Sequence, residues 1–379
     1  MILLDELPLD IETFWQDDAR AHEDNCFSKK APQIALGIRM SDECVFAELD
    51  EPGDPWGHTP IERRLELNRR YNDKAEKIVG RRLLNESADP HDAAFPEVKR
   101  IGEVFGGTYH FGQKTGEWLS GTAAKPAELA SLLDQVERLD LEDFMLPSNW
   151  HAEKKRIFDC YGKKPHQLRH VRGPVTLAAS VYGVENLIYL YYDAPELFSR
   201  FSETITRVIV EMSRIMDREA GFSEGEAPSG FSFADDDCCL LTPEMYEVFG
   251  YPVLKTVFEC FASDVNDKRF QHSDSDMAHL LPLLGKLNLT GCNFGPTVLI
   301  DQIRAYMPRT RIDGCLAPFT FMDNDPQAIA AEVRRDFQMI QQLGTRGLNL
   351  STAGSINNGS RLESMRLIMA LIQHEGRYM

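Results

Sequence analysis

Two residues that could perform chemistry, His272 and Asp274, lie two positions apart in the sequence. If this stretch is extended, residues two apart point to the same side of a strand, so both side chains share one face. An imidazole and a carboxylate on one face can bind a divalent cation, and Zn²⁺ accepts both kinds of ligand. The alternative is that His272 hydrogen-bonds Asp274 or another neighbour and binds no metal.

Three consecutive carboxylates, Asp235, Asp236 and Asp237, directly follow an apolar segment and could add a ligand to the same site. They cannot all be buried and ionised, because like charges raise one another's pKa. At least one should therefore face solvent or cap the following helix, while another could donate a proton or accept a hydrogen bond from a substrate. The candidate catalytic residues are Asp235, Asp236, His272 and Asp274.

Two arginines, Arg169 and Arg172, flank an earlier apolar segment. A planar guanidinium suits bidentate binding of a substrate carboxylate, but the same side chains could instead neutralise the aspartate run. Cys292 and Cys315 follow later apolar segments and could supply thiolate ligands to a metal. Further candidate substrate-binding residues are Asp237, Asn293 and Ser355.

The elements that must position these residues are short apolar segments, each closed by small or polar residues and followed by a helical pattern. This alternation is typical of βα units and predicts an α/β protein. When eight such units close into a (β/α)8 TIM barrel, the chemistry lies at the carboxyl ends of the strands, where these candidates would converge. For any single residue, the alternative is an ordinary polar strand end. The five clearest segments are 230–234, 269–272, 287–290, 311–312 and 348–350.

Three helical patterns connect these segments. The sequence predicts a long amphipathic helix over Pro195–Ala220, with apolar residues three or four positions apart. It predicts a second helix over Pro243–Ala262, capped by Thr242, and a helix-like run over Met277–Leu287.

Composition excludes several classes of protein. The chain has 379 residues, of which 43% are hydrophobic and 26% are charged, as in an ordinary globular enzyme. Its formal net charge of -18 argues against nonspecific nucleic-acid binding, which needs a basic surface. It has no apolar run long enough for a membrane span and no basic, cleavable amino terminus, so we expect a cytoplasmic protein. Its eight cysteines contain no CxxC pair and are expected to be thiols.

The order and spacing of several segments resemble the uroporphyrinogen decarboxylase superfamily, which also includes cobalamin- and coenzyme-linked methyltransferases. The resemblance implies a (β/α)8 barrel with its site at the carboxyl face of the strands. It covers residues 97–379 and leaves residues 1–96 as an amino-terminal elaboration. The segments that carry it are Arg172–Ala178, Phe233–Tyr246, His272–Asp274, Tyr306–Gly314 and Gly354–Ser360.

The sequence departs from both branches of that superfamily. The decarboxylases carry an amino-terminal Arg-Gln-Ala-Gly-Arg-like motif that holds substrate carboxylates, and the nearest segment here is Gly37–Met40. The zinc methyltransferases use a His-x-Cys pair and a later Cys. Here Asp274 takes the place of the first Cys, and the later region, Ser351–Ser355, contains none. The thiolate-rich zinc site is therefore absent in the form that the superfamily builds.

The resemblance implies three alternative functions. The first is methyl transfer between a small methylated compound and a corrinoid, carried by a partner protein, or another cofactor. A divalent metal, zinc first among the candidates, would act there as a Lewis acid. The second is a lyase reaction, the cofactor-independent decarboxylation of a porphyrinogen or related polycarboxylate, with Arg169 or Arg172 binding carboxylates and an Asp stabilising the protonated pyrrole. The third is a non-catalytic barrel that binds a small molecule or tetrapyrrole. A homo-oligomer is compatible with each.

Overall fold

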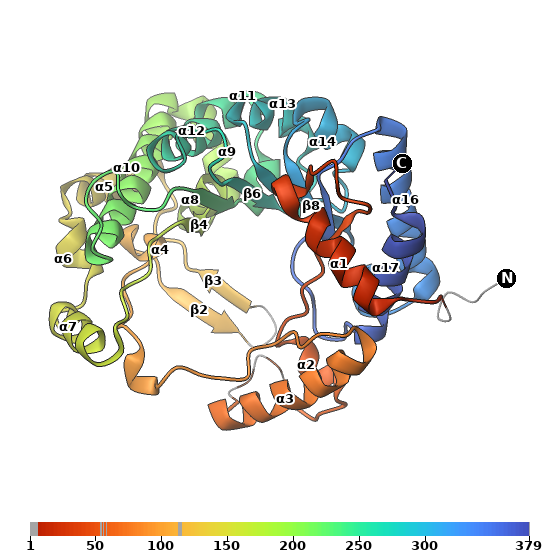
Figure 1. Cartoon of the computed structure of the whole chain (residues 1–379). Coiled ribbons are helices and arrows are strands. Elements are labelled where there is room, and N and C mark those ends of the chain that lie inside the picture. Colours follow the sequence, from red (N-terminus) through yellow and green to blue (C-terminus); the bar gives the residue numbers. More distant parts are fainter. Residues whose placement is uncertain (1–6, 54, 56, 58, 113–115, 379) are drawn as a thin grey trace. The chain divides into compact units, whose positions relative to one another are not determined.

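The computed structural model describes residues 7–53, 55, 57, 59–112 and 116–378. The chain forms two compact units. The first contains residues up to 88, 273–281 and from 290 onward, and the second contains residues 89–272 and 282–289. Figure 1 labels many of the elements of both units. Within the described residues, the structure contains no helix that is both long and apolar enough to span a membrane.

The second unit is built on three parallel strands in the order β6-β5-β4. A separate antiparallel hairpin pairs β2 with β3. The strands are β2 (Tyr109–Gly112), β3 (Gly116–Leu119), β4 (His170–Arg172), β5 (Phe231–Ala234) and β6 (Arg269–Ser273), whose last residue belongs to the first unit. The helices are α4 (Ile101–Val104), α5 (Pro126–Arg138), α6 (Leu141–Met145), α7 (Trp150–Tyr161), α8 (Pro174–Tyr182), α9 (Val184–Asp193), α10 (Pro195–Glu219), α11 (Pro243–Val248) and α12 (Gly250–Phe261).

The first unit carries four parallel strands in the order β1-β9-β8-β7. These are β1 (Ala35–Leu36), β7 (Gly291–Phe294), β8 (Arg311–Leu316) and β9 (Leu348–Thr352). Its helices are α1 (Ile11–Ala21), α2 (Cys44–Glu48), α3 (Ile61–Ile78), α14 (Ile300–Tyr306), α15 (Pro318–Asp323), α16 (Pro326–Leu343) and α17 (Leu362–Glu375). Each unit thus joins parallel strands to helices, which confirms the predicted α/β class.

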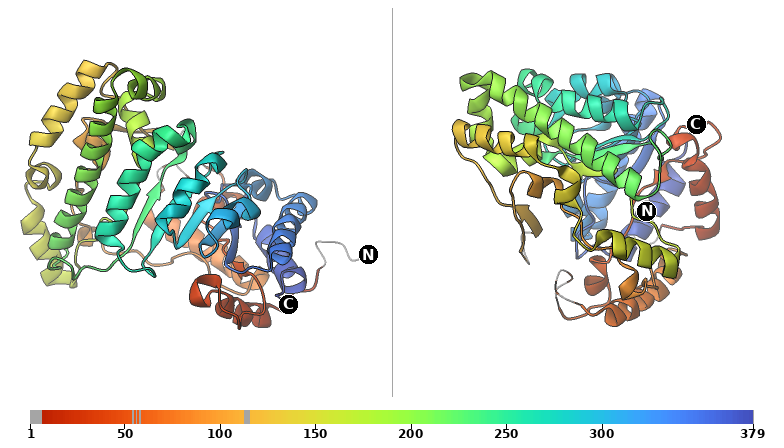
Figure 2. Two further views of the ribbon diagram at one scale, coloured as in Figure 1. Left: turned by 90° about the horizontal axis from the view of Figure 1, so that it is seen from above. Right: turned by 90° about the vertical axis from the view of Figure 1, so that its left-hand side faces the viewer.

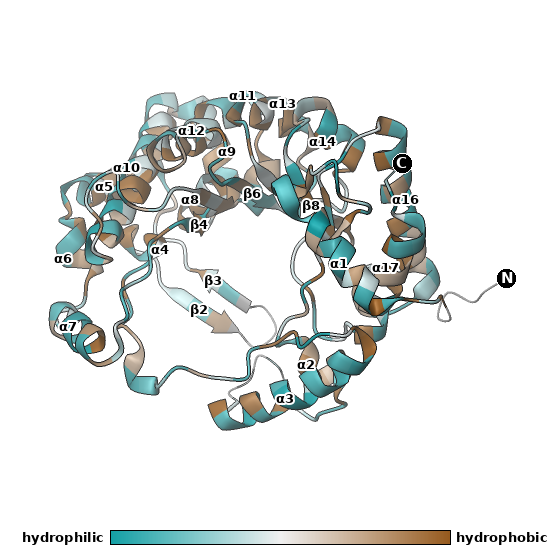
Figure 3. Ribbon diagram, viewed as in Figure 1, coloured by the Kyte–Doolittle hydropathy of each residue, from teal (hydrophilic) through white to brown (hydrophobic). Residues whose placement is uncertain are grey.

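Helix α12 packs against β5, and α10 packs against α12, so that the two helices run side by side in Figure 2. Phe231 of β5 stacks on Phe261 of α12 at 5.6 Å between ring centroids, and Phe233 meets Phe258 edge-on at 5.5 Å. Hydrophilic and hydrophobic residues alternate along the ribbons of these helices in Figure 3, as the predicted amphipathic pattern of Pro195–Ala220 requires. Because alternate strand residues point away from this core, the opposite face of the strands is free to carry polar side chains.

Several predicted boundaries were wrong. The helix predicted over Pro243–Ala262 is divided at Phe249 into α11 and α12, although Thr242 caps its start by accepting a hydrogen bond from the Met245 N–H. The run from Met277 to Leu287 forms short turns of 3₁₀ and α-helix rather than one helix. Pro282 lies in its middle, where a proline removes a helical hydrogen-bond donor.

Strand β7 begins at Gly291, after the predicted segment 287–290, and β8 runs on through Leu316. Cys292 and Cys315 therefore lie inside strands rather than after them. Gly and Cys are small enough to pack within a buried strand, so they are not reliable signs of its end.

Candidate active site

The register of the three strands of the second unit places Arg172, Ala234 and His272 in one row. Arg172 of β4 pairs with Ala234 of β5, and Ala234 pairs with His272 of β6. Paired residues of neighbouring strands point to the same face, so Arg172 and His272 lie on either side of the Ala234 methyl group. Adjacent strands lie ~4.8 Å apart, which puts the backbones of the two outer residues roughly 10 Å apart.

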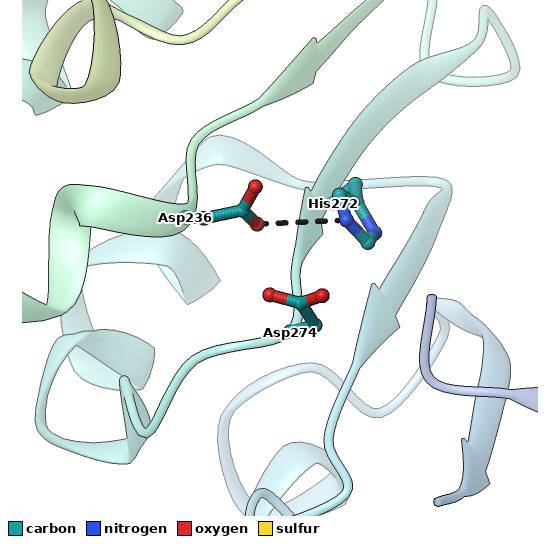
Figure 4. Close-up of side chains that lie close together, drawn as sticks. All are labelled: Asp236, His272 and Asp274. Atoms are coloured by element: carbon teal, nitrogen blue, oxygen red, sulfur yellow. Dashed lines mark ion pairs between the residues drawn. The ribbon is translucent and has the colours of Figure 1, made fainter. Parts of the chain in front are cut away.

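The aspartate run begins where β5 ends and brings Asp236 to His272. Asp236 Oδ1 lies 3.5 Å from His272 Nε2, and the two side chains are 45% and 22% exposed (Figure 4). Asp274 follows His272 by two residues on the same segment, so the covalent chain itself keeps it near the imidazole. One ligand atom from each of the three lies within 4.8 Å of the others.

This donor set fits a metal ion. One imidazole nitrogen and two carboxylate oxygens suit Zn²⁺ or another borderline to hard divalent cation. Because Asp236 and Asp274 are partly or fully exposed, further coordination positions are open to water or substrate. Among the residues that the structure describes, this is the one group of three or more His, Cys, Asp or Glu side chains close enough to share an ion.

Asp235 takes a different place, in the protein interior. It has no exposed surface, and its Oδ1 accepts a 2.8 Å hydrogen bond from the Thr176 N–H in the first turn of α8. Burial raises the pKa of Asp235 to about 7. Its close neighbour is Gly173, where an added Cβ would lie 2.1 Å from the Asp235 Cβ. The predicted catalytic Asp235 therefore anchors α8 beneath the site, and the glycine before Pro174 leaves room for it.

Asp237 is half-buried beside the row. Burial is the main reason that its pKa is raised; the charge of Asp236 also raises it, and the charge of Arg172 opposes this effect. Its N–H donates a 3.0 Å hydrogen bond to Thr176 Oγ1, so the same turn of α8 positions Asp235 and Asp237. Of the three carboxylates, Asp236 is the one paired with His272.

The two arginines, Arg169 and Arg172, differ in their interaction partners. Arg169 forms an ion pair with Asp217 at 2.7 Å, and its guanidinium lies 4.7 Å from the centre of the Phe261 ring. This pairing and stacking make Arg169 a structural residue. Arg172 is half-buried and has one long hydrogen bond, 3.5 Å from its Nη1 to Ser180 Oγ. The described part of the chain places no carboxylate in an ion pair with it, so its charge is available to an anionic ligand.

Two polar residues that were not predicted from the sequence lie two positions before Arg172 on β4 and two positions before Ala234 on β5. His170 pairs with Ser232 in the register, and His170 Nδ1 lies 3.0 Å from Ser232 Oγ. The pKa of His170 is lowered first by its partial burial and then by electrostatic interaction with Lys268 and His272. The alternation of His170 with Arg172 was the signal that both point to one face.

The remaining predicted residues lie in the first unit. Cys292 and Cys315 have no exposed surface, and burial raises the pKa of both thiols, so both remain protonated. Asn293 links β7 to the end of β9, two strands away: its Nδ2 donates to the Thr352 carbonyl at 3.0 Å, and its Oδ1 accepts from the Gly354 N–H at 3.0 Å. Ser355 is exposed beyond the end of β9.

Comparisons with known proteins agree with the resemblance seen in the sequence. The family model of uroporphyrinogen decarboxylase (URO-D) matches residues 161–374. A solved structure of a methyltransferase from Methanosarcina mazei aligns over 90% of this chain and 93% of its own, with 16% identity and a TM-score of 0.54, which shows a similar fold. A comparison with curated protein sequences gives no match. The chain belongs to the uroporphyrinogen decarboxylase family.

Proposed function

We propose that the chain is a metal-dependent methyltransferase that exchanges a methyl group between a small methylated compound and a corrinoid, carried by a partner protein, or another cofactor. The observation that carries this proposal is the meeting of Asp236, His272 and Asp274. Bound there, a divalent ion such as Zn²⁺ would act as a Lewis acid on the heteroatom that carries or receives the methyl group. The family and the fold of the methyltransferase from Methanosarcina mazei support the same reading, and they support closure of the strands into a (β/α)8 barrel.

The other residues of the row would position the substrate. Arg172 would hold an anionic group, because its guanidinium has no ion-pair partner among the described residues and is partly shielded from water. Ala234 leaves space between Arg172 and His272. The backbones of these two residues are roughly 10 Å apart, and both side chains extend into that span, so the substrate would be small, with its anionic end at Arg172.

Decarboxylation is the second candidate, and one observation favours it. Asp237 has a raised pKa and lies close enough to Arg172 to feel its charge. Arg172 could bind the leaving carboxylate while Asp237 donates the proton that replaces it. This reaction uses the same face of the strands without a metal.

Metal content separates the two candidates. Mass spectrometry on the purified protein should find about one zinc or other divalent ion per chain, as expected for one site. Replacement of Asp236, His272 or Asp274 by alanine should remove it. His170→Ala is the matched control, because His170 stands on the same strand face but outside the three-residue group, and this variant should keep the metal.

A positive result leads to methylated donors incubated with cob(I)alamin, with methyl transfer read from the corrinoid spectrum. A folded wild-type protein that stays metal-free after incubation with zinc would overturn the methyltransferase proposal. Porphyrinogens and small polycarboxylates would then be tested for release of carbon dioxide. A tetrapyrrole that binds without turnover in either assay would indicate the non-catalytic barrel.

A further inference from the structure

A second cluster of reactive side chains lies within the first unit, at the end of α1. Asp18, His22 and Cys26 follow one another at four-residue intervals. His22 Nε2 lies 3.5 Å from Asp18 Oδ2, and His22 Nδ1 lies 3.9 Å from Cys26 Sγ. The imidazole therefore bridges a carboxylate and a thiol, the order of groups that activates a cysteine nucleophile.

Tertiary contacts hold each end of this chain of groups. Asp18 is 4% exposed, and its Oδ1 accepts a 2.8 Å hydrogen bond from the Leu36 N–H of β1. The Cys26 carbonyl accepts a 2.9 Å hydrogen bond from the Gly347 N–H. The His22 side chain is 38% exposed and forms the solvent side of the cluster. The thiol is 3% exposed at the residue level, so a small molecule has access before a bulky one.

The backbone that leads from His22 to Cys26 is strained. Asp24, Asn25 and Cys26 have φ angles of 50°, 51° and 69°, three successive non-glycine residues in the left-handed region. Such residues persist where their surroundings impose the conformation. Here Asn25 supplies the restraint: its Nδ2 donates to the Thr290 carbonyl at 2.7 Å, and its Oδ1 accepts from Arg311 Nη1 at 3.0 Å.

Charged side chains lie close to the sulfur of Cys26. The hydrogen bond to Asp18, followed by that to Cys26, raises the pKa of His22 to about 10, so the imidazole is protonated at neutral pH. Arg311 is close enough for a charge on Cys26 to raise its pKa in turn. Tyr378 also faces the cysteine, but burial raises the pKa of its phenol to about 12, which keeps it neutral. The cationic side chains of His22 and Arg311 therefore both lie within electrostatic reach of the Cys26 sulfur.

We propose that Cys26 is a hydroperoxide-reactive thiol, activated by His22 and oriented by Asp18, and that it is a redox site independent of the proposed methyl transfer. The thiolate sulfur attacks the terminal, hydrogen-bearing oxygen of the hydroperoxide. An S–O bond forms, the O–O bond breaks, and the leaving alkoxide (hydroxide when the peroxide is hydrogen peroxide) takes the proton of the His22 imidazolium to become an alcohol or water. Sulfur is oxidised to the sulfenic acid, and the peroxide is reduced by the same two electrons.

The test is the rate at which hydrogen peroxide oxidises each cysteine of the intact protein, measured by trapping the sulfenic acid with a dimedone probe and quantifying each cysteine-containing peptide by mass spectrometry. Cys26 should react at least about tenfold faster than the exposed Cys160 and Cys260, because the His22 imidazolium lies beside its sulfur and can protonate the leaving oxygen.

His22→Gln should lower the rate at Cys26 about tenfold or more, because a glutamine cannot protonate the leaving oxygen. His151→Gln is the matched control, because His151 also lies on a helix and its Nδ1 is 4.0 Å from a carboxylate oxygen of Glu219. This variant should leave the rate at Cys26 unchanged. Circular dichroism checks that each variant is folded. The proposal is overturned if wild-type Cys26 reacts no faster than Cys160. This comparison uses the wild-type protein, so it decides the question even if His22→Gln does not fold.

Discussion

Asp236 and His272 belong to different segments of the chain, yet Asp236 Oδ1 lies 3.5 Å from His272 Nε2. The cross-strand register causes this meeting. Ala234 is the partner of His272 in the sheet, and the chain leaves β5 just after Ala234, so Asp236 turns back over the edge beside the imidazole. On the other side of Ala234 stands Arg172. The row therefore joins a cation to a histidine–carboxylate pair across one small residue, an arrangement suited to a small anionic ligand.

The first prediction separates the two arginines. Arg172→Ala should change the free energy of unfolding by less than about 0.5 kcal/mol, because Arg172 has no ion-pair partner in the described structure. Arg169→Ala should lower it by about 1–3 kcal/mol, since it leaves Asp217 partly buried without its partner. Urea unfolding of both variants measures the difference.

The same pair of variants tests anion binding. Phosphate and short dicarboxylates should raise the melting temperature of the wild type and of Arg169→Ala, because a ligand that binds only the folded state stabilises it. Arg172→Ala should lose this response. An equal response in both variants would show that the anion binds elsewhere.

A second prediction concerns the contact between Gly173 and Asp235. Gly173→Ala should destabilise the protein by about 1–3 kcal/mol, because the new methyl group would overlap the Asp235 side chain in a packed region. Gly121→Ala is the control: there an added Cβ would meet its nearest neighbour at 3.5 Å, an ordinary contact. Urea unfolding should leave the Gly121 variant close to the wild type. Equal stability of the two variants would contradict the packing described for Gly173.

A third prediction follows from the raised pKa of Asp235. Burial raises this pKa from its ordinary value of 3.8 to about 7 in the folded protein, so the folded state holds a proton that the unfolded state releases. The contribution to stability is therefore full below about pH 4 and is lost as the pH rises through about 7. Asp235→Asn cannot titrate and keeps an acceptor for the Thr176 N–H. Its unfolding free energy should fall less steeply between about pH 5 and pH 8 than that of the wild type, as measured in urea. Parallel pH profiles would show that Asp235 does not titrate in this range.

A fourth prediction concerns the cysteines that could have been metal ligands. Cys292 and Cys315 are fully buried thiols with raised pKa values, so an aromatic disulfide reagent should not label them in the folded protein. The exposed Cys160 and Cys260 should react quickly under the same conditions. In denaturant all eight cysteines should react. Rapid labelling of Cys292 or Cys315 in the native state, located by peptide mapping, would contradict their burial.

Much of this architecture follows from local patterns in the sequence. The amphipathic spacing over Pro195–Ala220 predicted a helix that the structure shows as α10, from Pro195 to Glu219. Strand β5 ends at Ala234, directly before the aspartate run, as predicted. The spacing of His272 and Asp274 indicated a shared face, and the family followed from the order of short motifs. These features depend on residues within a turn or a strand of one another, which sequence periodicity records.

The tertiary structure alone decided how residues of the same type, the three aspartates and the two arginines, differ in their surroundings. Asp235, Asp236 and Asp237 are consecutive residues of the same type. Packing against α8 buries Asp235, whereas the register with β6 brings Asp236 to His272. Arg169 and Arg172 lie in one segment, and either arginine could bind an anion. Only Arg169 pairs with Asp217, which is distant in the sequence. Burial and cross-strand register depend on residues far apart along the chain, so no local pattern contains them.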